Sequence, residues 1–283
     1  MNKTTFIFAS RLAFLSLAAS ITISFTACSS DAEPTIDEVL SKDTTPIDFE
    51  LTDFSRYDKY ILFDYAGSNY VKSDTASQSK CTVNLRQGKH HIIWVRMSAK
   101  DNFNPEDKTI TIGEHWQFPS LVNYTEMDFE VSPYLMPVKQ VNWENSVMCV
   151  LGIQITDIDE TLKHSDIYEE DCCGRITGLP FVKKVSLTSD YYETDKDLEL
   201  RVFAVNGNSN STKKDSVIVM ASRMFCPVNG LNNIQLKTEA QDENGNLVTG
   251  TTIPKFSLKR GHTTILRGPL FSGTTADWKV TIQ

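Results

Sequence analysis

Residues 47–54 read IDFELTDF, a stretch in which apolar and polar side chains alternate strictly from Ile47 to Thr52. The apolar residues Ile47, Phe49 and Leu51 fall on one face, and polar residues fall on the other. Because successive side chains of a strand point to opposite faces, this period of two predicts a half-buried β-strand. The same signal predicts a first group of further strands at 60–65, 80–85, 90–97, 108–112 and 129–135, with a turn at 87–89.

A second group of strands starts at residues 146–157, which read SVMCVLGIQITD. This run is nearly continuous in apolar residues, as expected for a strand buried at the centre of a sheet. Asn244-Gly245 is typical of a tight hairpin turn between two later strands. The other strands predicted in this group lie at 182–187, 197–205, 216–225, 233–240, 247–248, 263–271 and 278–282, and the one helical candidate lies at 158–169.

These segments predict an all-β fold. About a dozen strands separated by turn signals are typical of antiparallel β-sandwiches. A chain of 283 residues corresponds to about two domains. We therefore expect two tandem antiparallel sandwiches, the first at residues 47–138 and the second at residues 139–283, joined near Pro137.

The N-terminus has the features of a lipoprotein signal peptide at residues 1–27. Lys3 and Arg11 flank an uncharged stretch at residues 12–25, which is too short to span a bilayer but suits the apolar part of a secretory signal. The stretch ends in FTAC at residues 25–28, which resembles a bacterial lipobox. This pattern predicts cleavage between Ala27 and Cys28 and acylation of the Cys28 sulfur.

Acyl chains such as palmitate on Cys28 would anchor the protein without a spanning helix, because each buried methylene contributes about 0.8 kcal/mol. We expect an outer-membrane, surface-exposed location and a lipidated tether at residues 28–46. An ordinary cleaved signal, with Cys28 following Ala27 by chance, is the alternative.

The charge balance excludes one class of partner. The 28 Lys and Arg side chains are outnumbered by 36 Asp and Glu, for a net charge of −8. Loss of residues 1–27 removes two positive charges and no acid, which leaves 26 against 36, or −10. An acidic chain repels a phosphate backbone, so we expect no nucleic-acid partner.

No constellation of residues predicts an enzyme, a metal site or a cofactor. The chain lacks the serine-hydrolase, zinc-protease, P-loop and dinucleotide-binding motifs. The carboxylates that follow the long strand, from Asp157 to Glu160, are interpreted as a solvated turn rather than a calcium or acid–base site. Trp116 and Trp143 are candidate stacking platforms for a glycan.

The cysteines other than Cys28 form an odd set, so at least one of them is unpaired in an oxidising compartment. Buried free thiols are the simpler interpretation where a cysteine lies in an apolar alternation. A disulfide involving the 172–173 pair is the alternative, and the sequence leaves the pairing open among Cys81, Cys149, Cys172, Cys173 and Cys226.

Three segments together resemble the fimbrillin-like lipoproteins of Bacteroidetes, in particular their anchor and accessory subunits. Residues 257–268, SLKRGHTTILRG, are similar to the closing pattern of that family. Residues 85–94, LRQGKHHIIW, resemble a hairpin of its first domain, and residues 147–157 resemble the long strand that opens its second domain. The order of these motifs behind a lipobox carries the resemblance.

The resemblance implies two transthyretin-like sandwiches without an active site, and a fimbrial subunit that acts in cell adhesion and binds other subunits by strand exchange. Host or bacterial surface ligands are further implied partners. Stalk subunits of the family lose their first strand to a protease that cuts after arginine, and Arg56 is the early candidate here. A persistent lipid on Cys28 favours the base of the fibre, with residues 47–54 kept as the protein's own edge strand.

Two further expectations accompany the resemblance. The triplet at residues 74–76 is similar to the O-glycosylation triplet of exported Bacteroidetes proteins, which makes Thr75, in a polar loop, the first candidate for a glycan. The alternative to a fimbrial role is a surface glycan-binding lipoprotein associated with polysaccharide uptake, with Trp116 or Trp143 as its platform.

Overall fold

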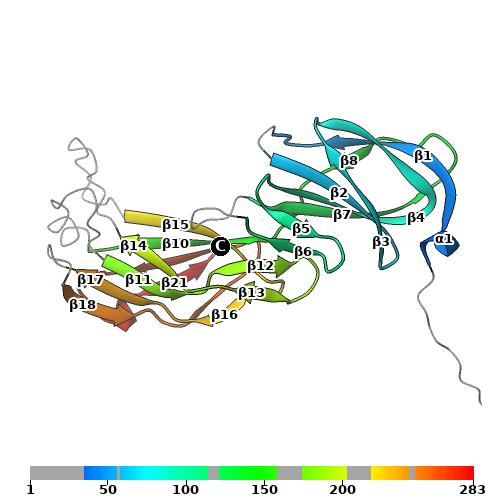
Figure 1. Ribbon diagram of the computed structural model, residues 1–283. Coiled ribbons are helices and arrows are strands. Elements are labelled where there is room, and N and C mark those ends of the chain that lie inside the picture. Colours follow the sequence, from blue (N-terminus) through cyan, green and yellow to red (C-terminus); the bar gives the residue numbers. More distant parts are fainter. Residues whose placement is uncertain (1–34, 56–57, 114–120, 158–173, 203–217, 242–245) are drawn as a thin grey trace, which may run out of the picture. The chain divides into compact units, whose positions relative to one another are not determined.

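The computed structural model describes residues 35–55, 58–113, 121–157, 174–202, 218–241 and 246–283 (Figure 1). Strands dominate these residues, which confirms the all-β fold class. The described helices are one four-residue turn, α1 (Ile36–Val39), and one 3₁₀ turn, η1 (Thr275–Asp277). Neither of these helices is long enough to cross a bilayer.

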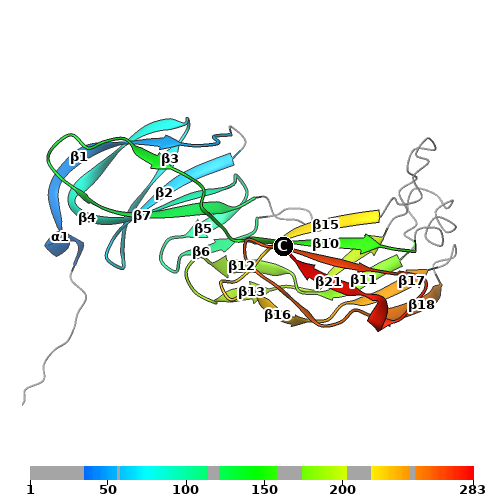
Figure 2. The same cartoon turned by 180° about the vertical axis from the view of Figure 1, so that it is seen from behind.

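The first sheet has the strand order β3-β2-β4-β1-β8, and β7 pairs with both β4 and β9. All pairings are antiparallel except that of β1 with β8, which is parallel. Figure 2 shows these strands from behind. Their bounds are β1 (Leu40–Leu51), β2 (Asp58–Ala66), β3 (Asn69–Ala76), β4 (Lys80–Ser98), β7 (Asn123–Val131), β8 (Lys139–Val141) and β9 (Asn145–Ser146).

The predicted turn at residues 87–89 is wrong, because β4 runs through these residues without a break. Residues 80–88 pair with β1, whereas residues 88–98 pair with β2 and β7. Gly88 lies at this change of partner with a φ of 137°. A Cβ there would lie 2.7 Å from Leu40 Cδ2 and 2.9 Å from the Val39 carbonyl oxygen, so only glycine permits this approach. The segment 85–94 is therefore a bent strand rather than a hairpin.

A second sheet has the order β13-β12-β6-β5 and combines segments from early and late in the sequence. β6 pairs with β12, and Ile110 lies opposite Val185. The two segments lie on either side of the predicted domain boundary at residues 138 and 139, which itself stays a prediction. The bounds are β5 (Asn102–Asn104), β6 (Thr109–Thr111), β12 (Val182–Ser186) and β13 (Tyr192–Thr194).

The late part of the chain forms three further sheets, with the orders β15-β10-β20-β21, β14-β11-β17-β18 and β16-β19. β10 lies between β15 and β20, as the apolar run at residues 146–157 predicts. The bounds are β10 (Met148–Ile155), β11 (Gly174–Leu179), β14 (Leu198–Val202), β15 (Ile218–Phe225), β16 (Leu231–Ile234), β17 (Lys237–Gln241), β18 (Leu247–Thr252), β19 (Phe256–Leu258), β20 (Thr263–Gly268) and β21 (Lys279–Ile282).

Two boundaries of predicted elements need correction. The sequence predicts a tether at residues 28–46, but within this range residues 36–46 form α1 and the first half of β1. Backbone pairing with β4, from Thr44 opposite Arg86 onward, keeps this half extended although its sequence lacks β-branched alternation. The strand expected at 129–135 lies at 123–131, because its ladder with β4 ends at Val131 opposite Gly88.

Buried apolar side chains form two clusters. The smaller one joins β1 to β2, β4 and β8, and its members are Ile47, Phe49, Leu51, Tyr60, Leu62, Ala76, Val83, Leu85, Ile92, Trp94, Val131 and Val141. We call it the β1 core. The larger cluster extends from the other side chains of β2 and β4 through β6, β10, β11 and β12 to β20.

Candidate assembly site

Strand β1 places every second side chain of its C-terminal half in the β1 core. Ile47, Phe49 and Leu51 are at most 3% exposed, whereas Asp48 between them is exposed. Fully burying a large apolar side chain contributes about 1.5–3 kcal/mol, so these three residues hold the strand firmly in its place. The predicted period of two at residues 47–51 is confirmed in this detail.

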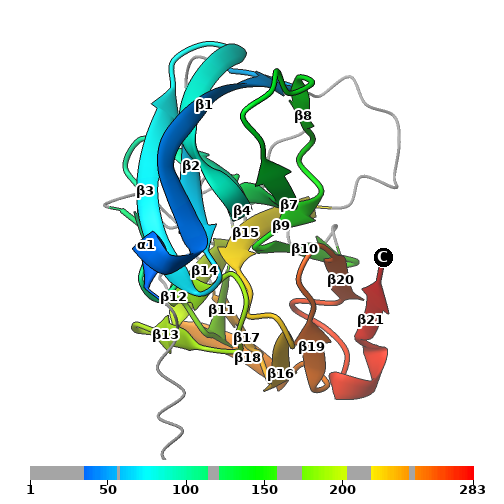
Figure 3. The same cartoon turned by 90° about the vertical axis from the view of Figure 1, so that its right-hand side faces the viewer.

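β1 has a strand on both sides at its C-terminal end, so the prediction of an edge strand is wrong. It pairs antiparallel with β4 from Thr44 to Glu50, and its last three residues pair parallel with β8. Figure 3 shows β8 beside β1. β8 has only three residues, Lys139–Val141, so the sequence has no alternation long enough to predict this strand.

The Arg86 side chain binds the backbone at the start of β1. Its guanidinium donates to the Leu40 carbonyl at 2.8 Å, to the Ser41 carbonyl at 2.7 Å and to the Asp37 carboxylate at 2.8 Å. The two carbonyl contacts hold the β1 backbone directly, whereas the contact with Asp37 is largely exposed and screened by water. We refer to these contacts as the Arg86 clamp. No pattern in the sequence pairs Arg86 with these acceptors, which lie 45 or more positions away.

A second set of contacts holds the chain just after β1. The Thr52 backbone N–H and hydroxyl both donate to the Val141 carbonyl, at 3.1 and 2.9 Å. The Trp143 indole N–H donates to the Thr52 carbonyl at 2.7 Å, and its ring packs against Tyr60 with centroids 5.5 Å apart. Trp143 is partly buried and packs against the β1 core, which favours a packing role over a glycan platform.

Arg56 and Tyr57, which follow this segment, are not among the described residues. The prediction of cleavage after Arg56 thus lies outside the described residues. Such a cleavage would nevertheless separate all of β1 from the rest of the chain, because β1 ends at Leu51. The strands β4 and β8 would then lose the partner between them.

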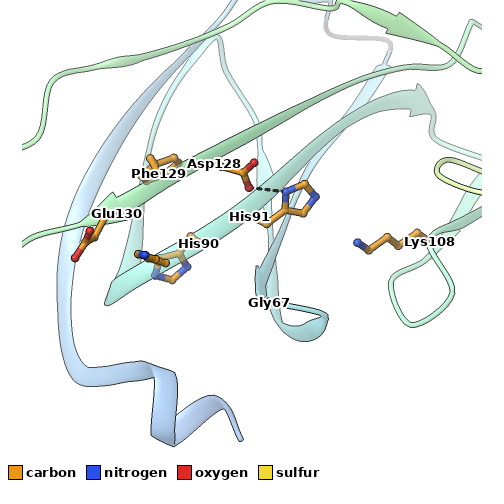
Figure 4. A pocket seen from close by; sticks show the side chains of 8 residues that line it. Gly67, His90, His91, Lys108, Asp128, Phe129 and Glu130 are labelled. Atoms are coloured by element: carbon orange, nitrogen blue, oxygen red, sulfur yellow. Dashed lines mark hydrogen bonds and ion pairs between the residues drawn. The ribbon is translucent and has the colours of Figure 1, made fainter. Parts of the chain in front are cut away.

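A hollow of about 650 Å³ lies against the middle of β4, beyond the residues that pair with the C-terminal half of β1 (Figure 4). Its lining carries both signs of charge, and His91 contacts Asp128 there at 2.8 Å. The eight lining residues include no serine, threonine or cysteine nucleophile, and they are Gly67, Lys89, His90, His91, Lys108, Asp128, Phe129 and Glu130. Nothing in this set selects one chemical class of ligand.

His90 and Asp64 form a buried pair beside the hollow. Nδ1 of His90 lies 2.6 Å from Asp64 Oδ1, and Nε2 lies 2.6 Å from the Arg86 carbonyl oxygen. Both side chains are at most 1% exposed. The pair holds the backbone of Arg86 through its carbonyl oxygen, and Arg86 forms the clamp on β1, so the role of the pair is structural. The acid within the apolar run ILFDYA at residues 61–66 is the sequence signal that a buried partner was needed.

Other residues singled out by the sequence have structural places. Asp157 accepts the backbone N–H groups of residues 270, 271 and 272 at 2.7, 2.6 and 2.9 Å, which fixes the loop before η1. Thr75 is exposed, but it lies within β3 rather than in a loop. Its position opposite Ile61 in the ladder with β2 keeps the segment extended. Glycosylation of Thr75 stays a prediction.

Several predicted sites lie outside the described residues. They include the signal cleavage site at Ala27 and Cys28, the helical candidate at 158–169, the hairpin turn at 244–245, Trp116, Cys172 and Cys173. Among the residues that are described, no group of three or more His, Cys, Asp or Glu side chains is placed to hold a metal ion.

Comparison with known proteins gives a likeness in fold. No protein-family model and no curated protein matches the chain. The solved structures that it resembles include adhesins and fimbrial proteins of Bacteroidetes.

Two of these solved structures illustrate the likeness. The tip fimbrial protein Mfa3 of Porphyromonas gingivalis has 9% identity and a TM-score of 0.45, with 84% of this chain and 97% of that chain covered. A fimbrial assembly protein of Parabacteroides distasonis has 9% identity and a TM-score of 0.42, with 85% and 96% covered.

Proposed function

We propose that this protein is a structural subunit of a fimbria that is anchored in the outer membrane by lipid on Cys28 and acts in cell adhesion. The observation that carries the proposal is the arrangement of β1. It is a separable N-terminal strand, complete before Arg56, whose side chains fill the β1 core between β4 and β8. Subunits that assemble by strand exchange need a groove of this kind.

The intact β1 supports a position at the base of the fibre. While β1 stays in its place, the backbone groups of β4 and β8 on its two sides are already paired with it. A strand from a neighbouring subunit would have to displace three buried apolar side chains to enter, at about 1.5–3 kcal/mol each. The groove is thus closed to a partner, and a lipid on Cys28 stays joined to the folded protein.

A different edge would then receive the next subunit. β21 is the outermost strand of its sheet and the last strand of the chain. All four of its side chains are exposed, including Val280 and Ile282. An edge strand with exposed apolar side chains is a template for pairing with another chain. We propose that β21 offers this edge to a neighbouring subunit.

The N-terminus of the mature protein tests the anchor role. We expect mass spectrometry of the protein from membranes to find an acylated Cys28 at the N-terminus and an intact bond after Arg56. Replacement of Cys28 by alanine should release the protein from membranes. An N-terminus at Tyr57 would instead indicate a stalk subunit, and sedimentation of the C28A variant with membranes would contradict lipid anchoring.

Isolation of surface fibres tests the fimbrial role itself. Fibres sheared from cells should contain this protein together with other subunits in a ladder of polymers. Lysine substitution of Val280 and Ile282 should weaken its recovery in fibres. Lysine substitution of Tyr134 and Leu135, two exposed apolar residues that lie outside the strands, should not. A protein that is present at the surface but absent from every fibre would refute the proposal.

A further inference from the structure

Two cysteines that are far apart in the sequence share one buried face of the sheet formed by β15, β10 and β20. Cys149 lies on β10, opposite Met224 of β15. Cys226 follows β15 directly, and its backbone N–H donates to the Val147 carbonyl at 2.8 Å, which extends the ladder by one pair. Because side chains two positions apart on a strand lie on the same face, Cys149 and Cys226 are diagonal neighbours on it.

The two thiols are in contact. They lie within hydrogen-bonding reach of each other, and the Cys226 thiol also lies 3.6 Å from the Leu258 carbonyl oxygen. Both side chains are at most 1% exposed. The hydrogen bond with Cys226, followed by burial, raises the pKa of the Cys149 thiol, so Cys149 is a poor nucleophile once the protein has folded.

We propose that Cys149 and Cys226 are joined by a disulfide bond in the exported protein. The inference rests on the export that the proposed function requires, because a periplasmic or surface location is oxidising. In the structure all three described cysteines, Cys81, Cys149 and Cys226, are free thiols, so the proposed bond is one that oxidation would add. Cys81 is half-buried on β4 and is expected to stay a free thiol.

The bond forms by thiol–disulfide exchange with a disulfide oxidant. The thiolate of one cysteine attacks the oxidant, and the second thiolate then displaces the oxidant's remaining sulfur from the mixed disulfide. Both cysteines lose their protons, one S–S bond forms, and the oxidant leaves as two thiols. Since the folded protein buries both sulfurs, the exchange takes place before folding of β10 and β15 into the sheet makes the sulfurs inaccessible to the oxidant.

The bond would close a loop between two residues that are 77 positions apart, 149 and 226. A crosslink across a long loop lowers the conformational entropy of the unfolded chain. In the folded state it would tie the central strand β10 to the segment that leads from β15 into β16. We therefore expect the protein with this disulfide reduced to unfold at a lower temperature than the oxidised protein. The backbone of the folded state should be the same in both.

Peptide mapping of the wild-type chain tests the assignment directly. Trypsin places each candidate in its own peptide: Cys81 in residues 81–86, Cys149 in 140–163, the pair Cys172 and Cys173 in 164–175, and Cys226 in 224–237. The protein is purified from the cell envelope, alkylated in denaturant without reduction and then digested. We expect peptides 140–163 and 224–237 to be joined, at a mass about 2 Da below their sum.

Free, alkylated Cys149 and Cys226 in protein recovered from the cell envelope would overturn the proposal, as would a link from either of them to peptide 164–175. The C81S variant is the matched control and should leave the joined pair unchanged. The C149S variant should leave Cys226 alkylated.

A refolding experiment separates this inference from the proposed function. The full chain without its signal is refolded in a buffer of reduced and oxidised glutathione, where no export is needed. Formation of the bond there, combined with free thiols in protein found inside the cell, would contradict export and leave the pairing intact. Failure to form it there, with lipidated protein at the surface, would contradict the pairing alone.

Discussion

Phe49 and Trp94 meet edge to face in the β1 core, with ring centroids 5.4 Å apart and planes at 68°. Phe49 comes from β1, and Trp94 comes from the half of β4 that pairs with β2 and β7 rather than with β1. The contact therefore joins β1 to the half of β4 with which it forms no backbone pairs. Both rings are at most 1% exposed.

Replacement of Phe49 by alanine should lower the free energy of unfolding by about 3–5 kcal/mol, because it removes a buried ring and leaves a cavity. Urea unfolding followed by tryptophan fluorescence measures this loss. Thr44, which is exposed on the same strand, provides the control. The T44A variant should change the free energy by less than about 0.5 kcal/mol. Equal losses in the two variants would show that the β1 core does not hold β1.

Replacement of Arg86 by alanine should loosen the start of β1 without unfolding the protein. The carbonyls of Leu40 and Ser41 lose a charged donor, which is worth about 1.5–3 kcal/mol for one such hydrogen bond. Since about 1.4 kcal/mol corresponds to a factor of ten, amide hydrogen exchange across residues 40–45 should quicken about tenfold or more.

Lys89 is the matched control for this prediction, because it is an exposed cation on the same strand. The K89A variant should leave exchange across residues 40–45 unchanged. If R86A also leaves it unchanged, the Arg86 clamp has no part in holding β1.

Acid should weaken the junction between the β5–β6 turn and β12. Burial raises the pKa of Asp107, but hydrogen bonds from Thr109 and Lys184 and the Lys184 charge outweigh it and lower the pKa below that of a free aspartate. A group whose pKa is lowered by folding stabilises the protein above its unfolded pKa and loses this contribution as the pH falls through its folded pKa. The effect is modest, because the pair is exposed and screened.

The D107N variant should therefore lose less stability than the wild type between pH 5 and pH 3. The midpoint of urea unfolding, followed across this range at low salt, measures the difference. The E106Q variant removes the neighbouring exposed charge, which forms no ion pair with a described residue, and should behave like the wild type. Identical acid profiles for D107N and wild type would contradict the assignment.

Replacement of Arg260 by lysine should destabilise the protein by about 2–3 kcal/mol, because charged hydrogen bonds to buried acceptors are lost. The guanidinium donates to the carbonyls of Cys226, Leu187 and Ser186 at 2.8, 2.9 and 2.7 Å. A single ammonium group cannot reach three acceptors that the planar guanidinium matches.

Arg267 is exposed on β20, and its replacement by lysine is the control for Arg260. The R267K variant should be within about 0.5 kcal/mol of the wild type in urea unfolding. An R260K variant as stable as R267K would show that Arg260 does not hold β12 to the end of β15.

The local sequence determined the strands, because a period of two is a property of neighbouring residues. Residues 47–51 bury and expose their side chains as their alternation predicts, and the apolar run at 146–157 forms a strand with neighbours on both sides. The all-β class follows from such segments taken together. The lipobox at Cys28 is likewise a local signal, and the lipidation that it indicates stays a prediction.

Only the tertiary structure decided which strands meet. Gly88 carries a turn signal, yet it lies in a bend of β4, because ladder partners on both sides of it keep the strand extended. β8 turns β1 from an edge strand into an interior one, and Cys149 reaches Cys226 across 77 positions. These relations depend on contacts between distant segments, which no local period encodes, because a strand's own residues specify its two faces but not its neighbours.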